Sequence, residues 1–546
     1  MQWRFLSDRV PQKIADVSEI LLSNRQITDA DEFFQPKSPA EITPADIEMG
    51  LEQLKVAKDR ILEAIEKKQK ILVFGDYDAD GICATAVLWE ALYDLGADAM
   101  PFIPHREKHG YGLTWAAVEE LKKHSLPDLV ITVDTGITAV ETVKLLRQEG
   151  VDVIISDHHQ PDETLPNALA IVHTTMVSGA SVAWFLAREL NEKAAQNSLD
   201  LVTIAAISDM MPLLGVNRSL VWHGLEVLRN TKRPGLQALF KAGGFKTKDI
   251  DAGTVGYGIA PRINAMGRLS HGLDALRLLC TTSSKKAKEL ATLVDDTNAD
   301  RQQLTDDLLQ LAKQQVRGQR DQSLLIAHSP DFHEGVIGLI AGKLAEWYAK
   351  PAIVISTRGD SAKASARSVP GVNITELIRT GKKLLLEVGG HPMAAGFGFE
   401  LSKLDDVMNH LYQYAQENID PELLQKTLDI ECLIPTSLVN KELISTINKF
   451  APFGQSNYQP VFALQNLKIK QVQTVGNQQQ HLKLTLTDSK GELDLPALAW
   501  GRGEAANNLQ PDDLINVAGV LETNEWRDRV TVQLILRDLQ PAESNL

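Results

Sequence analysis

Three aspartates alternate with other residues directly after a short apolar run. The run Ile71–Phe74 predicts a buried strand, and it ends at Gly75. The carboxylates of Asp76, Asp78 and Asp80 follow, and like charges this close together raise the cost of ionising one another. A hard divalent cation between them removes that cost, and Mg²⁺ and Mn²⁺ prefer carboxylate oxygens. Taken alone, the spacing also fits a solvated acidic turn or a set of helix caps.

Polar side chains also follow three later apolar runs. Asp134 ends the first, Asp157-His158-His159 end the second, and Asp209 ends the third, whose alanine content leaves strand and helix both open. Alternating strand and helix patterns predict a mostly parallel sheet with helices on both faces, and sites in such sheets lie at the carboxyl ends of the strands. Carboxylates mixed with imidazoles, without cysteine, favour Mn²⁺ or Mg²⁺ over structural zinc. Two such ions could activate a water for attack on phosphorus.

The elements that must position these residues divide the chain into six segments of an α/β protein. These are a leader at 1–50, a parallel-sheet catalytic domain at 51–270, a long helical connector at 271–320, a smaller α/β domain at 321–400, a helical linker at 401–451 and a small β-barrel at 452–546. We expect the leader to contain a small helical piece that packs on the catalytic domain.

Bulk properties narrow the class of protein. The length of 546 residues allows three or four domains, and a net charge of −15 argues against a protein that coats nucleic acid without specificity, although a local basic surface remains possible. No apolar run is long enough for a transmembrane helix, and the first residues do not have the pattern of a signal peptide. Cys83, Cys280 and Cys432 have no metal-type spacing, which fits a reducing cytoplasm. Nothing indicates an oligomer, so we expect a monomer.

The ordered motifs resemble the DHH phosphoesterase superfamily, which is named for the triplet Asp157-His158-His159. Longer stretches are similar to one branch, the bacterial RecJ exonucleases specific for single-stranded DNA. They are GDYDADG (75–81), GYGL (110–113), VDTGI (133–137), SDHH (156–159), APRINAMGRL (260–269), HEGVIGLIAGKL (333–344), SARS (365–368), GGHPMAAGF (389–397) and APFGQSNYQPVF (451–462). The manganese pyrophosphatase branch has a histidine where this chain has Phe74, which separates it from the present sequence.

The resemblance implies a two-metal centre that includes the three alternating aspartates. Asp78 and Asp80 would each favour a different ion, Asp76 would lie in or next to the ligand set, and Asp134 would bridge the two ions.

The later motifs would complete this centre. The resemblance implies that His158 binds a metal and that His159 binds a metal or faces the scissile phosphate. Asp209 would complete the ligand set of the second ion. Asp157 would orient one of these histidines without binding a metal itself.

Arginines are expected to hold the negative strand against this acidic centre. The resemblance implies substrate contacts from Arg262, Asn264 and Arg268 in one loop and from Ser365 and Arg367 in another. An ordinary surface salt bridge is the alternative for each arginine.

Further substrate contacts are expected from a glycine-rich loop and from the barrel. Gly390 and His391 belong to the loop, which would offer backbone N–H groups to a phosphate. The barrel resembles an oligonucleotide-binding fold, in which Trp526 is a candidate for stacking on a base and Trp500 is expected in the core.

The resemblance implies a metal-dependent single-strand-specific 5′→3′ exodeoxyribonuclease of recombination and repair that releases 5′-mononucleotides. Two alternatives are a small-substrate phosphodiesterase, acting on short oligonucleotides or cyclic dinucleotides, and a non-catalytic scaffold that binds single strands. A small-substrate enzyme has no need of the barrel, and a scaffold has no need of the ligands. By family analogy, the partners would be single-stranded DNA, a single-strand-binding protein and a helicase.

Overall fold

The computed structural model describes residues 1–110, 112–123, 126–526 and 529–542; for residues 525, 526 and 529 it describes the backbone alone. The chain forms two compact units. The larger comprises residues 43–211 and 223–426, and the smaller comprises residues 1–42, 212–222 and 427–546. Among the described residues, every helix is too short or too polar to cross a membrane.

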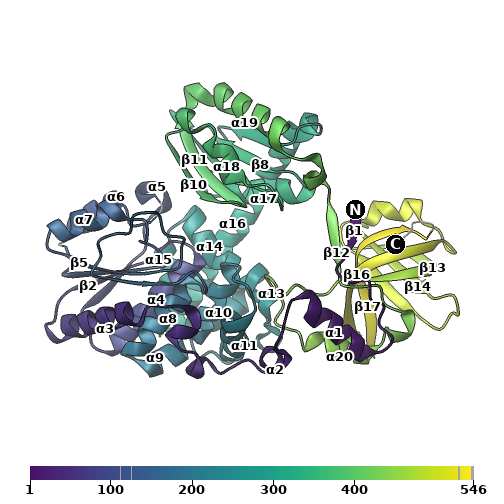
Figure 1. Cartoon of the computed structure of the whole chain (residues 1–546), viewed down its shortest axis with the longest axis horizontal. Helices are drawn as coiled ribbons and strands as arrows, with labels where there is room; N and C mark the ends of the chain where they lie inside the picture. The colour runs from purple at the N-terminus through teal and green to yellow at the C-terminus, as the bar shows by residue number, and fades with distance from the viewer. Residues whose placement is uncertain (111, 124–125, 527–528, 543–546) are drawn as a thin grey trace. The chain divides into compact units, whose positions relative to one another are not determined.

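The larger unit contains a five-stranded parallel sheet in the order β3-β2-β4-β5-β6. Its strands are β2 (Ile71–Phe74), β3 (Ala99–Phe102), β4 (Leu129–Val133), β5 (Asp152–Asp157) and β6 (Ala170–His173). Helices α3 (Leu51–Glu66), α4 (Ala79–Asp94) and α8 (Gly179–Leu190) cover one face, and α6 (Trp115–Lys122) and α7 (Val140–Gln148) cover the other (Figure 1). Because the strands run parallel, the carboxyl ends of β2, β4 and β5 meet at one edge of the sheet, as the sequence predicts.

The fourth apolar run is a helix, α10 (Leu199–Ser208), and Asp209 lies at its carboxyl end. Residues 199–206 are all buried, because α4, α8 and α14 (Ala260–Leu269) pack around α10. A helix that is apolar on every side gives the same sequence signal as a buried strand. The other helices of this part are α5 (Arg106–His109), α9 (Glu192–Asn197), α12 (Pro234–Ala242), α13 (Ala252–Thr254), the π-helix η4 (Val255–Ile259), α15 (Gly272–Cys280) and α16 (Ser284–Val316). Helix α11 (Gly215–Arg229) contributes residues 223–229 to this unit and residues 215–222 to the smaller one.

A second five-stranded sheet follows α16, in the order β10-β11-β9-β8-β7. Its strands are β7 (Leu325–Ser329), β8 (Ala352–Ser356), β9 (Ser361–Arg367), β10 (Glu387–His391) and β11 (Ala394–Glu400). Strands β7 and β8 pair in parallel and the other neighbours pair antiparallel. Helices α17 (Ile337–Tyr348), α18 (Ile374–Arg379) and α19 (Leu404–Asn418) belong to the same part.

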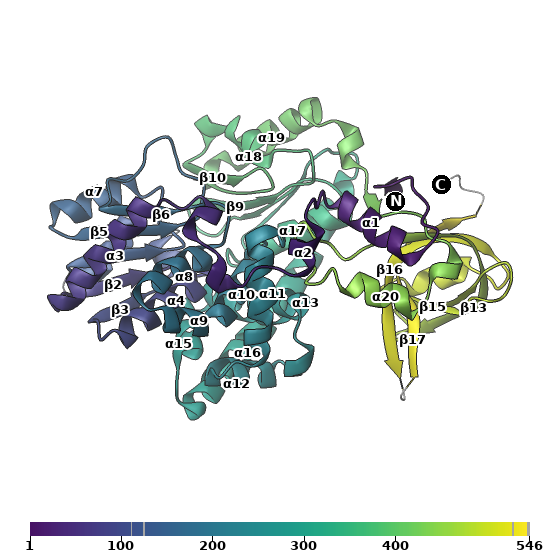
Figure 2. The ribbon, with the colours of Figure 1, turned by 60° about the horizontal axis from the view of Figure 1, so that its bottom comes forward.

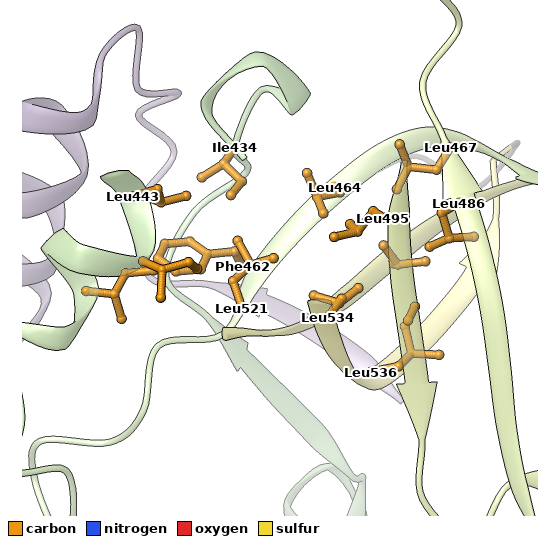
Figure 3. Packing of buried hydrophobic residues seen from close by; sticks show 14 of the residues in the cluster. Ile434, Leu443, Phe462, Leu464, Leu467, Leu486, Leu495, Leu521, Leu534 and Leu536 are labelled. Atoms are coloured by element: carbon orange, nitrogen blue, oxygen red, sulfur yellow. The ribbon is translucent and has the colours of Figure 1, made fainter. Parts of the chain in front are cut away.

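The smaller unit contains a closed five-stranded barrel, which confirms the predicted barrel. Its strands are β13 (Phe462–Val475), β14 (His481–Thr487), β15 (Leu495–Ala499), β17 (Arg529–Pro541) and β16 (Leu514–Trp526), in that order around the barrel. Leucines of these strands point into the interior, and Phe462 lies toward Leu443 of α20 (Lys441–Asn448) (Figure 3).

Residues 1–42 belong to this smaller unit, so the expectation that the helical piece of the leader packs on the catalytic domain is wrong; only residues 43–50 of the leader belong to the larger unit. Strand β1 (Gln2–Phe5) pairs in parallel with β12 (Thr427–Ile430), and α1 (Ile14–Asn24) lies beside α20 (Figure 2). Arg218 is 1% exposed and donates hydrogen bonds to the carbonyl oxygens of Phe33, Phe450 and Ala451 at 2.8–3.1 Å. This side chain ties three distant segments of the unit together.

Candidate active site

The three alternating aspartates are fixed by the turn between β2 and α4. Asp78 is the N-cap of α4 and accepts a hydrogen bond from the Gly81 N–H at 3.0 Å. Asp76 accepts one from the N–H of Tyr77 at 2.8 Å. A Cβ atom at Gly81 would lie 2.6 Å from Cβ of Asp76, so only glycine allows the turn to close this tightly.

The start of α8 holds the third aspartate. Asp80 accepts hydrogen bonds from the backbone N–H groups of Gly179 at 2.8 Å and Ala180 at 2.7 Å. The amino end of a helix favours a carboxylate. A Cβ atom at Gly179 would lie 2.2 Å from Oδ1 of Asp134, so this glycine leaves room for a second carboxylate.

Asp134 and His158 meet at the centre of the site. Asp134 is 1% exposed, and its Oδ1 accepts no hydrogen bond from the described residues. Nε2 of His158 lies 3.1 Å from that oxygen, 3.7 Å from Oδ2 of Asp80 and 3.8 Å from Oδ2 of Asp209. A buried carboxylate oxygen without a donor is costly unless a cation binds it.

The predicted ligands form three overlapping groups that could hold metal ions. Within each group, one ligand atom per residue lies within 4.8 Å of the others. The groups are Asp134, His158 and His159; Asp80, His158 and Asp209; and Asp76, Asp78 and Asp134. The sheet edge and α10 thus bring all seven predicted metal ligands together. Oxygen and imidazole donors around an unpartnered carboxylate oxygen fit Mn²⁺ or Mg²⁺.

Burial and like charges raise the pKa values of these carboxyl groups. Burial and the charge of Asp78 raise the pKa of Asp76 to about 8 and that of Asp80 to about 7. Burial and the charge of Asp80 raise the pKa of Asp209 to about 8, and they place the pKa of Asp134 well above its usual range. A divalent cation would oppose all four shifts, which is the electrostatic pattern of a cation site.

The two neighbouring histidines differ in their protonation. Burial and the charge of His159 lower the pKa of His158 to about 4, so its imidazole is in the neutral form that can bind a metal ion. Burial also opposes protonation of His159, but its hydrogen bond with Asp157 and the charge of that carboxylate raise the pKa to about 9. Nδ1 of His159 lies 2.8 Å from Oδ1 of Asp157, whose two oxygens also accept the N–H groups of Ile137 at 2.9 Å and His158 at 2.7 Å. Asp157 therefore fixes both the backbone that follows β5 and the orientation of the His159 ring.

The predicted substrate residues lie on regular elements rather than in loops, so that part of the expectation is wrong. Arg262, Asn264 and Arg268 lie on α14, Ser365 and Arg367 lie on β9, and Gly390 and His391 lie on β10.

Two residues of α14 are already engaged within the protein. Arg262 pairs with Asp295 at 2.7 Å and donates to the carbonyl oxygen of Gly258 at 2.9 Å, so its guanidinium group is already engaged. Asn264 accepts the N–H of Ala79 at 2.8 Å and donates to Oγ of Ser208 at 3.2 Å. Asn264 thus joins the aspartate turn to the end of α10, which is a positioning role.

Three arginines converge without a carboxylate partner among the described residues. The pKa of Arg268 is lowered to about 10 by burial and by the charges of Arg106 and Arg367, and the pKa of Arg367 is lowered by burial and by Arg106. A Cβ atom at Gly338, near the start of α17, would lie 3.0 Å from Oγ of Ser365 and 3.1 Å from Nη2 of Arg367. Guanidinium groups that repel one another beside a helix amino terminus are an arrangement that can bind an anion.

Sequence reasoning missed Arg106, whose guanidinium lies 5.4 Å from the centre of the Tyr77 ring. Its position four residues before the GYGL motif was the available signal. His391 is exposed, and its charge contributes to the lowered pKa of His158. Gly390 has a φ of +140°, and a Cβ atom there would lie 2.4 Å from the carbonyl oxygen of Ala394.

The barrel presents a tryptophan at a different place from the one expected. The side chain of Trp526 lies outside the described residues. Trp500, expected in the core, is 60% exposed because it follows the last residue of β15. Its ring packs edge-on against that of His481, and the two ring centres are 4.7 Å apart. Trp500 and Lys483 line a pocket of about 490 Å³ together with Val475, Pro496, Ala497, Leu498, Asn524 and Gln533.

Three family models match this chain: the DHH family N-terminal domain at residues 70–206, the DHHA1 domain at 321–417 and the RecJ OB domain at 430–538. Together with the carboxylate and histidine centre, they place the chain in the DHH class of proteins. The fold agrees with a crystal structure of RecJ from Thermus thermophilus in complex with Mn²⁺, with a TM-score of 0.85 and 30% identity over 100% of this chain and 80% of that one. The chain belongs to the RecJ family.

Curated relatives support this assignment. The single-stranded-DNA-specific exonuclease RecJ of Thermus thermophilus is 33% identical, over 91% of this chain and 72% of its own length. The Bacillus subtilis protein of the same name is 34% identical over 90% of this chain, which spans only 64% of that relative.

Proposed function

We propose that this protein is a metal-dependent exodeoxyribonuclease that digests single-stranded DNA from the 5′ end and releases 5′-mononucleotides in recombination and repair. The observation that carries the proposal is the buried Asp134 oxygen, which has no hydrogen-bond donor among the described residues and lies where three ligand groups overlap. The polarity of digestion rests on the family resemblance.

In this proposal, Asp76, Asp78, Asp80, Asp134, His158 and Asp209 hold two Mn²⁺ or Mg²⁺ ions. Bound ions of this kind lower the pKa of a coordinated water and polarise the phosphodiester. His159 faces the scissile phosphate, and its raised pKa supplies a positive charge there. Asp157 orients His159 through Nδ1.

The arginine cluster supplies the recognition of the strand end in this proposal. Arg106, Arg268 and Arg367 bind the terminal phosphate, with Ser365 and the amino end of α17 beside them. Their mutual repulsion is relieved when an anion binds, which favours a phosphorylated end over an unphosphorylated one.

In this proposal, the barrel adds further contacts to the single strand. Trp500 offers an exposed ring for a base and Lys483 a charge for the backbone, as in other oligonucleotide-binding folds. By family analogy, a single-strand-binding protein and a helicase would act with the enzyme in the cytoplasm.

The test uses one oligonucleotide labelled at its 5′ or its 3′ end, in single-stranded and duplex form, with Mn²⁺, Mg²⁺ or EDTA. We expect metal-dependent release of mononucleotides from the 5′ end of the single strand alone. Asp134→Ala should abolish this release, whereas Asp94→Ala, at the exposed end of α4, should not. Binding without cleavage would instead support a scaffold, and cleavage of dinucleotides alone would support a small-substrate enzyme.

A further inference from the structure

An exposed tyrosine projects from a rare helix type that packs against the end of α10. Tyr257 lies on the π-helix η4, and its side chain is 91% exposed, the highest value among the large apolar side chains that the structure describes. π-helical turns are uncommon and recur at functional sites. An aromatic ring held in water needs an explanation, because burying it would be favourable.

The π-helix is attached to the helix that ends in a predicted metal ligand. A Cβ atom at Gly256 would lie 3.4 Å from Cγ2 of Ile207, two residues before Asp209. Asn264, on the helix that continues η4, bonds Oγ of Ser208 at 3.2 Å. Tyr257 therefore comes from a segment fixed against the carboxyl end of α10.

The end of α10 carries a second exposed apolar side chain, that of Met210. Met210 directly follows Asp209 and is 66% exposed. Its φ of +55° is in the left-handed region, which a methionine adopts at a cost. The N–H of Met210 donates to the carbonyl oxygen of Ile207 at 3.2 Å, and this turn keeps the side chain out in solvent.

We propose that Tyr257, together with Met210 at the end of α10, forms a shelf on which a nucleobase of the single strand stacks while the phosphate next to it occupies the metal centre. The proposal rests on the proposed function, because it takes single-stranded DNA as the ligand. A ring face and a thioether accept any base, since every base has a π-face. The arginine cluster binds phosphate and so recognises any strand end, whereas the shelf needs a base.

The experiment pairs a protein substitution with a substrate change. Tyr257→Ala, Tyr257→Phe and the parent bind a 5′-phosphorylated fluorescent oligonucleotide in EDTA, which stops hydrolysis. The oligonucleotide is either intact or carries abasic residues in its first nucleotides. Tyr93→Ala is the matched control, because Tyr93 is 65% exposed but lies at the end of α4 opposite the aspartate turn.

We expect Tyr257→Ala to weaken binding of the intact strand about tenfold, a typical loss for one stacked base. Tyr257→Phe and Tyr93→Ala should bind like the parent. On the abasic strand, Tyr257→Ala and the parent should bind equally, because the partner of the ring is gone. Equal binding of the intact strand by Tyr257→Ala and the parent would overturn the proposal, and so would an equal loss on intact and abasic strands.

The binding readout separates this proposal from the proposed function. A protein that binds but never cuts in Mn²⁺ would refute the exonuclease and still give the two affinities that decide about the shelf. If it cuts the intact strand with unchanged affinity in Tyr257→Ala, the shelf is refuted and the exonuclease stands.

Discussion

Replacing Gly179 by alanine would disturb the metal centre at a residue that carries no ligand atom. The new methyl group would lie 2.2 Å from Oδ1, 2.5 Å from Cβ and 2.6 Å from Cγ of Asp134, whereas ordinary contacts begin at 3.4 Å. Asp134 cannot easily move away, since it is 1% exposed and has a left-handed backbone with a φ of 59°. A displacement of about 1 Å costs about 100-fold in rate when it misplaces a catalytic group.

The assay must separate damage to the centre from damage to the fold. Alanine is favourable in a helix by up to about 1 kcal/mol relative to glycine, so α8 itself should tolerate the change. We expect Gly179→Ala to lose Mn²⁺ affinity in calorimetric titration and about 100-fold in cleavage rate, while the protein still folds with a thermal midpoint lowered by only the few degrees that overpacking by about 1–3 kcal/mol costs. Gly318→Ala is the control, because no atom lies within 4 Å of its new methyl group. Parental Mn²⁺ affinity and rate in Gly179→Ala would refute the steric argument.

Three other substitutions test the histidine, the anion site and the smaller unit. Asp157→Asn should return the pKa of His159 from about 9 toward its ordinary 6.5, measured by NMR titration of the ring in EDTA. The stabilising effect of this raised pKa is complete below about pH 6.5 and disappears as the pH rises through about 9, so the variant's stability deficit should shrink over that range. Arg367→Ala should raise KM for a 5′-phosphorylated strand about tenfold or more, since a charged hydrogen bond contributes about 1.5–3 kcal/mol. Arg218→Met should lower the free energy of unfolding by about 2 kcal/mol or more in urea titration, because it removes the Arg218 donor from the carbonyl oxygens of Phe33 and Ala451, whereas that of Phe450 still accepts from Asn457.

Two further arginines are matched controls for these substitutions. Arg262→Ala should leave KM unchanged, because Arg262 already pairs with Asp295. Arg4→Ala should cost no more than about 1 kcal/mol, because its pair with Asp429 is exposed. Equal KM increases in Arg262→Ala and Arg367→Ala would argue against a specific anion site. Parental stability of Arg218→Met, or an unchanged His159 pKa in Asp157→Asn, would contradict the other two predictions.

Much of the catalytic centre could be predicted because its information is local. Each of Asp76, Asp134 and Asp157 lies at or just after the end of an apolar run that is a strand, and parallel strands bring their carboxyl ends together. Asp209 was found by the same rule although its run is a helix, because the end of a fully buried helix can reach the same place.

The predicted substrate residues were harder to place because their contacts come from distant segments of the chain. The alternation of serine and alanine around Arg367 gave little strand signal, yet β9 pairs with strands on both sides. Arg262 and Arg268 lie on one helix, but only the second escapes an acidic partner, and no local pattern shows which one. Arg106 lies on a four-residue helix, which is too short to show a helical pattern of apolar residues in the sequence.

The pairing of β1 with β12 also has a consequence for synthesis of the chain. The first 42 residues emerge from the ribosome about 400 residues before the segment that completes their unit. At about 5–20 residues per second, this delay lasts about 20–80 s. During that time Val17, Ile20 and Leu21, which are buried in the finished protein, have no core to enter, while the larger unit can already fold. The nascent leader is therefore the segment that most needs protection from aggregation until translation is complete.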